Sequence, residues 1–98
     1  MSSPTRQVDP ADLRLPPTRA GGADPLKLHQ QIRKYGAATD GMPPLFVYED
    51  PDGLLEIIDG VTRATRAAKL APGTPVPVVV IGRYRRSRAG SPTVRDRL

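Results

Sequence analysis

The sequence contains no cysteine and no tryptophan, and it has one histidine among its 98 residues. The absence of cysteine excludes disulfides, thiolate zinc sites and a cysteine nucleophile. We expect no metal site built from the protein's own side chains. No stretch approaches the roughly 18 apolar residues that a membrane span needs, and residues 1–7 lack the apolar segment of a signal peptide. We therefore expect a cytoplasmic, soluble protein without a membrane partner.

Aromatic residues are also scarce, at 4%, and hydrophobic residues make up 38% of the chain. A chain of this length and composition forms one small domain, whose core is built mainly from Leu, Ile, Val and Ala. The twelve prolines and nine glycines lie mostly between the candidate elements. This distribution favours a compact body with stiff loops over a wholly disordered chain.

The formal net charge of +5 is unevenly distributed. Residues 83–98 hold six arginines and one aspartate, whereas residues 1–82 hold nine basic and nine acidic residues. The segment after residue 82 also has the Arg, Ser, Gly and Pro bias of a flexible tail. We predict a disordered N-terminus at residues 1–7, a folded domain at residues 8–82, and a basic, disordered tail at residues 83–98.

The first helix is predicted to begin at Asp24-Pro25, where an acid at the N-cap precedes a proline in the first turn. Gly36 is the expected end of this helix. Between them lies one apolar stripe that we expect to face a sheet, formed by Leu28, Ile32 and Tyr35. Residues 8–15 carry only a weak strand signal.

The following residues predict a hairpin, a helix and a further strand. Residues 45–48 and 54–58 are predicted strands joined by an acidic turn with Pro and Gly, and residues 76–81 are a third strand beyond the helix. Pro77 cannot donate a hydrogen bond, so it should lie at an edge or at the entrance of its strand. We expect Glu56 on an outward position of the returning strand.

The junction between the returning strand and the second helix is the most informative part of the chain. It reads Asp59-Gly60-Val61-Thr62-Arg63, with Arg66 one turn further on. Glycine lets the backbone approach a ligand closely, and the free N–H groups of a helix N-terminus attract an anion. Since Arg63 and Arg66 are three residues apart, they can reach the same anion. The sequence predicts a phosphate site here.

The same residues resemble a known family. The order of elements and the motifs resemble the ParB/sulfiredoxin superfamily, which includes the ParB-like nuclease domain. The predicted hairpin is followed by Asp-Gly-x-Thr-Arg-x-x-Arg-Ala-Ala-Lys-Leu and then by Pro-Val-Pro-Val-Val-Val. The resemblance covers about Val8 to Gly82. It implies a small α/β (α+β) domain with a short mixed sheet and two main helices, and a nucleic acid or nucleotide as the partner, with nuclease activity as one possibility.

The resemblance also implies site residues. The expected phosphate- or nucleotide-binding residues at the helix start are Gly60, Val61, Thr62, Arg63 and Arg66. A loop lies beside the nucleotide phosphates in this family, which adds Thr39, Asp40 and Gly41. Asp59 could act in catalysis, hold a divalent cation such as the Mg²⁺ that accompanies a nucleotide, or cap the helix. A nuclease would need Asp59, with Asp40, to share that ion.

Two departures from the family pattern leave alternatives open. Val61 and Thr62 stand where partition proteins have a glutamate and an arginine, so we do not expect a CTP-switched clamp. Sulfiredoxin chemistry needs a cysteine in this turn and is excluded. The alternatives are a noncatalytic DNA- or protein-interaction module, or a small nucleotide-dependent kinase or toxin-like effector.

The basic tail is a second candidate for binding nucleic acid. It combines one aromatic ring, Tyr84, with four closely spaced guanidinium groups, at Arg83, Arg85, Arg86 and Arg88. Such a segment binds the phosphate backbone without sequence preference and in a salt-dependent way. The alternative is a tail that only raises solubility.

Overall fold

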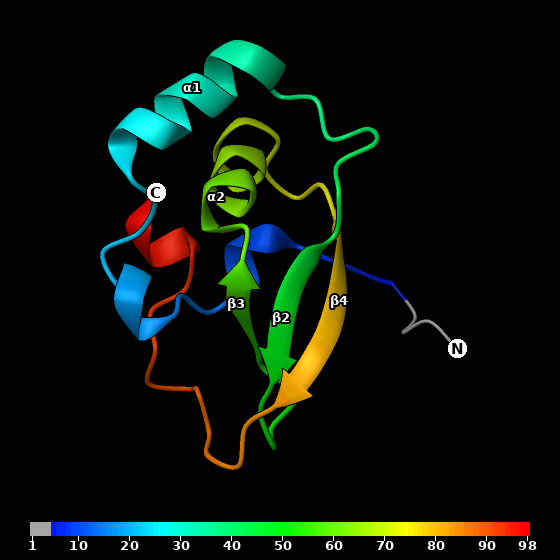
Figure 1. The fold of residues 1–98 in the computed structure, drawn as a ribbon, viewed down its shortest axis with the longest axis vertical. Helices are drawn as coiled ribbons and strands as arrows, with labels where there is room; N and C mark the ends of the chain where they lie inside the picture. The colour runs from blue at the N-terminus through cyan, green and yellow to red at the C-terminus, as the bar shows by residue number, and fades with distance from the viewer. Residues whose placement is uncertain (1–4) are drawn as a thin grey trace.

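The structure, a computed structural model, describes residues 5–98. These residues form an α+β fold with two helices and a four-stranded mixed sheet (Figure 1). The elements in chain order are β1 (Arg6–Val8), α1 (Pro25–Tyr35), β2 (Leu45–Glu49), β3 (Leu55–Asp59), α2 (Val61–Leu70) and β4 (Val76–Arg83), with short 3₁₀ helices at Pro10–Asp12, Pro17–Arg19 and Arg95–Arg97. The predicted helix 24–36, the hairpin, the helix after residue 60 and the last strand are confirmed.

The sheet has the strand order β1-β4-β2-β3. β2 and β3 form the antiparallel hairpin, β4 runs parallel to β2, and β1 runs antiparallel to β4. Pro77 is the second residue of β4 and lies opposite Gln7 of β1, whereas pairing with β2 begins at Val78. The proline therefore sits at the strand entrance, as predicted, where the missing N–H costs no bond to β2.

The N-terminal prediction is wrong in part. Arg6 and Gln7 belong to β1, within the segment expected to be disordered, because they pair with β4. Residues 1–4, the rest of that segment, lie outside the described residues. The weak strand signal at residues 8–15 corresponds mainly to the 3₁₀ turn Pro10–Asp12, which the Asp9 side chain caps by accepting from the Ala11 amide.

The core joins α2 to the sheet. Ala64, Ala67 and Ala68 of α2 are almost fully buried and belong to the same apolar cluster as the inward-facing strand residues. Their small side chains allow the helix to approach the sheet closely. α1 packs against α2, and none of its own residues is fully buried. The prediction that the apolar stripe of α1 faces a sheet is therefore wrong, since α2 already occupies that position (Figure 1).

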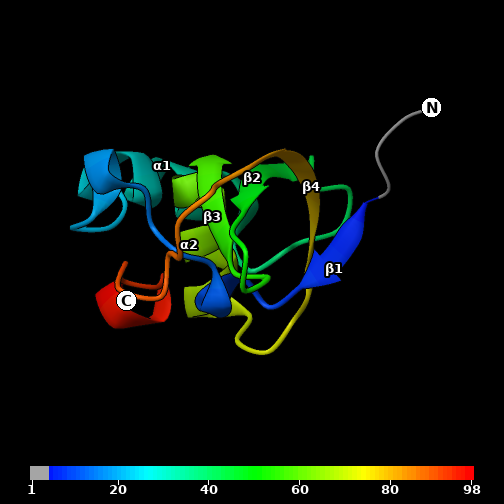
Figure 2. The same ribbon diagram turned by 90° about the horizontal axis from the view of Figure 1, so that it is seen from below.

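The C-terminal segment, residues 83–98, is not a flexible tail. Its backbone pairs with the chain near Leu13–Leu15: the Leu15 amide donates to Pro92 O at 2.8 Å, and the Val94 amide donates to Leu13 O at 2.9 Å. Val94 is 1% exposed and forms part of the core. Figure 2 shows the segment running from the end of β4 to the side of the fold away from β1. Its polar composition did not reveal this anchoring, because one buried apolar side chain, backbone hydrogen bonds and polar contacts to residues far along the chain provide it.

Glu56 also differs from expectation, because it is fully buried rather than outward-facing. The Tyr84 hydroxyl donates a hydrogen bond to its carboxylate, and Arg88 Nε lies 3.4 Å from Oε1. The Arg88 guanidinium also lies 3.9 Å from the centroid of the Tyr84 ring. A buried carboxylate is tolerated only with such partners. Both come from the C-terminal segment, so Glu56 helps to hold that segment in place.

Candidate functional site

The start of α2 is formed by a glycine in a conformation that other residues rarely adopt. Gly60 has φ 111° and ψ 22° and is the N-cap of α2, and no side chain caps this helix. A Cβ atom at this position would overlap the buried Leu45 side chain and lie 3.0 Å from Arg63 Nη2. The glycine is thus required by the backbone and by packing. It leaves the first amides of α2 without a side-chain acceptor.

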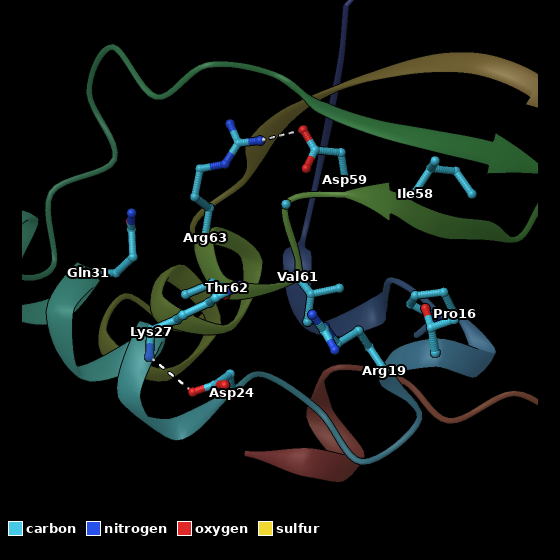
Figure 3. A pocket seen from close by; sticks show the side chains of 12 residues that line it. Pro16, Arg19, Asp24, Lys27, Gln31, Ile58, Asp59, Val61, Thr62 and Arg63 are labelled. Carbon is cyan, nitrogen blue, oxygen red and sulfur yellow. Dashed lines mark hydrogen bonds and ion pairs between the residues drawn. The ribbon is translucent and has the colours of Figure 1, made fainter.

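The first turn of α2 lines a cleft of about 430 Å³, which we call the Gly60 cleft. Its walls come from residues 16–19, the first turns of α1, the end of β3 and the first turn of α2. Figure 3 shows the charged side chains entering from these different elements. They are the cations Arg19, Lys27 and Arg63 and the carboxylates Asp24 and Asp59. The cleft therefore combines a helix N-terminus with an excess of positive charge.

Arg63 lies over the glycine. Its guanidinium donates to Pro43 O at 3.0 Å and lies 3.5 Å from the carboxylate of Asp59 (Figure 3). The side chain is 22% exposed. Asp59 is much more exposed, so its pairing with Arg63 is worth only about 0–1 kcal/mol. An incoming anion can therefore compete with Asp59 for the guanidinium.

Arg66 does not join Arg63 at the helix start. It is 3% exposed, and its Nη1 donates to the carbonyl oxygens of Gly36 and Ala38 at 2.9 and 2.7 Å. Burial lowers the pKa of the Arg66 guanidinium from its ordinary value, and the nearby Tyr35 opposes that shift. The expectation that both arginines grip one anion is wrong, because Arg66 holds the loop that follows α1.

The loop residues Thr39, Asp40 and Gly41 lie away from the Gly60 cleft. Asp40 and Gly41 line a second cleft of about 330 Å³, which we call the Tyr35 cleft. Its other walls include Tyr35, Met42, Pro43 and the two α2 arginines. Thr39 is seen only in a turn, where its carbonyl accepts from the Met42 amide. Arg63 and Gln31 line both clefts and link them.

The carboxylates near the site do not fit a metal held by the protein. Asp59 lines the Gly60 cleft and Asp40 the Tyr35 cleft, so they do not share one position. Asp24 caps α1 by accepting from the Leu26 and Lys27 amides. Within residues 5–98 no group of three or more carboxylate or histidine side chains could hold a metal ion.

The remaining predicted residues of the turn have modest roles. Val61 is buried, and its carbonyl accepts a hydrogen bond from the Thr65 hydroxyl at 2.8 Å. Thr62 lines the Gly60 cleft without capping α2. Asp59 does not cap the helix either, and instead pairs with Arg63. The side chains of Thr62 and Asp59 thus remain at the cleft wall.

The arginines after residue 82 are partly neutralised. Arg83 lies 2.5 Å from the Glu49 carboxylate, which Arg6 also contacts, at 3.0 Å. These two arginines hold the pKa of Glu49 below its ordinary value. Arg88 pairs with the buried Glu56, as described above. Of the four arginines predicted to bind nucleic acid, Arg85 and Arg86 are exposed and have no ion pair among residues 5–98.

Sequence reasoning missed several residues of the cleft. Arg19, Lys27 and Gln31 all line it, although they lie some 30 to 40 residues before Gly60. One signal for Lys27 was present in the sequence, since residues 25–35 contain three basic residues and no acid. No local pattern indicated Arg19, which the turn Pro17–Arg19 brings to the start of α2.

Comparison with known proteins adds no identification. No family model, no curated protein and no solved structure matches the chain. Within residues 5–98, neither helix has the length and apolar character needed to cross a bilayer.

Proposed function

We propose that this protein is a ParB/sulfiredoxin-like domain that binds a phosphate-bearing ligand, a nucleic acid or a nucleotide, in the Gly60 cleft. The observation that carries the proposal is the uncapped start of α2 at a cleft lined by three cations and two carboxylates. The family likeness is supported by the order of hairpin, glycine turn, helix and parallel strand. Free amides and cations together are the common means of binding phosphate.

A noncatalytic binding module is favoured over a nuclease by the placement of the acids. Metal-assisted cleavage requires carboxylates that converge on one ion, whereas Asp40 and Asp59 line different clefts. Asp59 is also paired with Arg63. We therefore propose binding without turnover.

The test is a titration followed by backbone amide NMR shifts. Inorganic phosphate, ATP and CTP, each with and without Mg²⁺, should produce saturable shifts at Gly60–Arg63. Arg63→Gln should weaken binding about tenfold or more, because a hydrogen bond to a charged group is lost. Lys69→Gln is the matched control, since it removes one positive charge from the same helix at an exposed position away from the cleft. The proposal fails if none of these ligands shifts the Gly60–Arg63 amides.

A further inference from the structure

The two helices carry positive charge only. α1 and α2 together contain six Lys and Arg residues and no Asp or Glu. Four of these cations are exposed and take part in no ion pair among residues 5–98; they are Lys27, Arg33, Lys34 and Lys69. In the C-terminal segment, by contrast, Arg83, Arg88 and Arg95 pair with carboxylates. Arg85, Arg86 and Arg97 of that segment take part in no ion pair among residues 5–98 either. The helices differ in carrying no carboxylate of their own beside their exposed cations, a pattern suited to a polyanion.

The clefts between the helices join into one groove. A third cleft, of about 320 Å³, shares Lys27, Gln31 and Thr62 with the Gly60 cleft, and it extends along α1 to Lys34. Gln31 also lines the Tyr35 cleft. Lys27 and Lys34 are two helical turns apart, about 10.5 Å along the axis. The groove thus offers successive cations along its length, as an extended chain of phosphates requires, rather than one isolated site.

An exposed aromatic ring lies at the end of this groove. Tyr35 is 45% exposed, and Lys34 Nζ and Arg66 Cζ each lie 5.2 Å from its ring centroid. Two buried polar atoms beside it, Arg66 Nε and Gln31 Oε1, have no hydrogen-bond partner among residues 5–98. One is a donor and the other an acceptor. The ring suits stacking against the face of a planar base, and the two polar atoms suit hydrogen bonds to the edge of that base.

We propose that the groove between α1 and α2 binds single-stranded nucleic acid. The proposal rests on the proposed function, because one phosphate of the strand occupies the start of α2. Lys27 and Lys34 bind further phosphates, and a base stacks on Tyr35 after the flexible Lys34 side chain swings toward the backbone. A duplex is disfavoured, because its bases are already stacked and cannot reach the ring. DNA and RNA strands present the same chemistry to these groups.

The first test measures where the phosphates bind. Binding of a fluorescein-labelled twelve-residue oligothymidylate is followed by anisotropy over a series of salt concentrations. The double variant Lys27→Gln/Lys34→Gln should reduce the slope of log K against log salt by about 1.4, since each phosphate contact to a single strand contributes about 0.7. The control Arg85→Gln/Arg86→Gln removes the same charge from the C-terminal segment and should leave the slope unchanged. A loss confined to the control would overturn the proposal.

The second test examines base stacking. Tyr35→Leu should weaken binding of the oligothymidylate roughly 5- to 100-fold, as for other stacking aromatics, whereas Tyr35→Phe should retain it. Circular dichroism confirms that both variants are folded. A twelve-base-pair duplex should compete poorly with the labelled oligothymidylate. A parallel titration with oligouridylate compares RNA with DNA. Equal binding by the Leu and Phe variants, or preference for the duplex, would refute the stacking site.

The experiments distinguish failure of the single-strand proposal from failure of the proposed phosphate site. If ATP or phosphate shifts the Gly60–Arg63 amides while neither oligonucleotide binds, the single-strand proposal fails and the phosphate site stands. If the oligonucleotides bind and shift Lys27, Lys34 and Tyr35 amides only, the phosphate site at α2 fails, and with it the proposed path of the strand.

Discussion

Replacing Gly60 by alanine should destabilise the protein more than the same change at another glycine with a similar backbone. Gly73 is the matched control, since it has φ 81° and no atom within 4 Å of the position of a Cβ. Both variants incur the strain of a left-handed alanine, about 1–2 kcal/mol. Only Gly60→Ala also forces a Cβ against the buried Leu45 side chain. Overpacking of this kind adds about 1–3 kcal/mol.

The assay is urea unfolding followed by circular dichroism. With an m-value of about 1 kcal/mol/M for a small domain, the midpoint of Gly60→Ala should lie roughly 1–3 M below that of Gly73→Ala. An equal loss in the two variants would refute the packing argument. In that case Gly60 would be needed only for its backbone conformation, and the close contact between the α2 start and Leu45 would not exist in solution.

Two further predictions concern the C-terminal segment. Val94→Ala should lower the free energy of unfolding by about 1–3 kcal/mol, because it leaves a cavity in the core. The control Leu98→Ala, at a 52% exposed residue, should change this free energy by less than about 0.5 kcal/mol. Similar midpoints of urea unfolding for the two variants would show that the C-terminal segment is not docked. Burial, and then the hydrogen bond to Glu56, raises the pKa of Tyr84 above its ordinary value of 10.0. As the pH rises, Tyr84 therefore loses its proton in the unfolded chain before it does so in the folded protein. The stability that the protonated Tyr84 contributes is complete below about pH 10 and declines as the pH rises through the pKa of the folded state. Tyr84→Phe should abolish this part of the alkaline loss, and identical slopes of unfolding free energy between pH 9 and 11 would contradict the buried contact.

The local signals in the sequence were reliable for the helices and strands. Asp24-Pro25 and Gly36 bound α1 as expected, because the cap and stop residues act on their own backbone. The hairpin and the glycine turn were also predicted. These features depend on residues that are neighbours in the chain.

Errors arose where a side chain finds its partners far along the sequence. Arg66 follows the expected helical spacing, yet it turns to the carbonyls of Gly36 and Ala38, some 30 residues earlier. Glu56 alternates like an outward strand residue, yet Tyr84 and Arg88 cover it. Periodicity predicts which face of an element a residue occupies, and it does not predict what lies against that face.

The sequence by itself determined the helices, the hairpin, the glycine at the start of α2 and the absence of acids from both helices, because each follows from local backbone preference or from composition. Only the tertiary structure decided that α1 lies on α2, that residues 83–98 pack against the domain, and that Lys27, Gln31 and Arg63 line one groove. Those arrangements depend on the burial of Val94, the alanine face of α2 and Glu56, and burial is a property of contacts between distant segments.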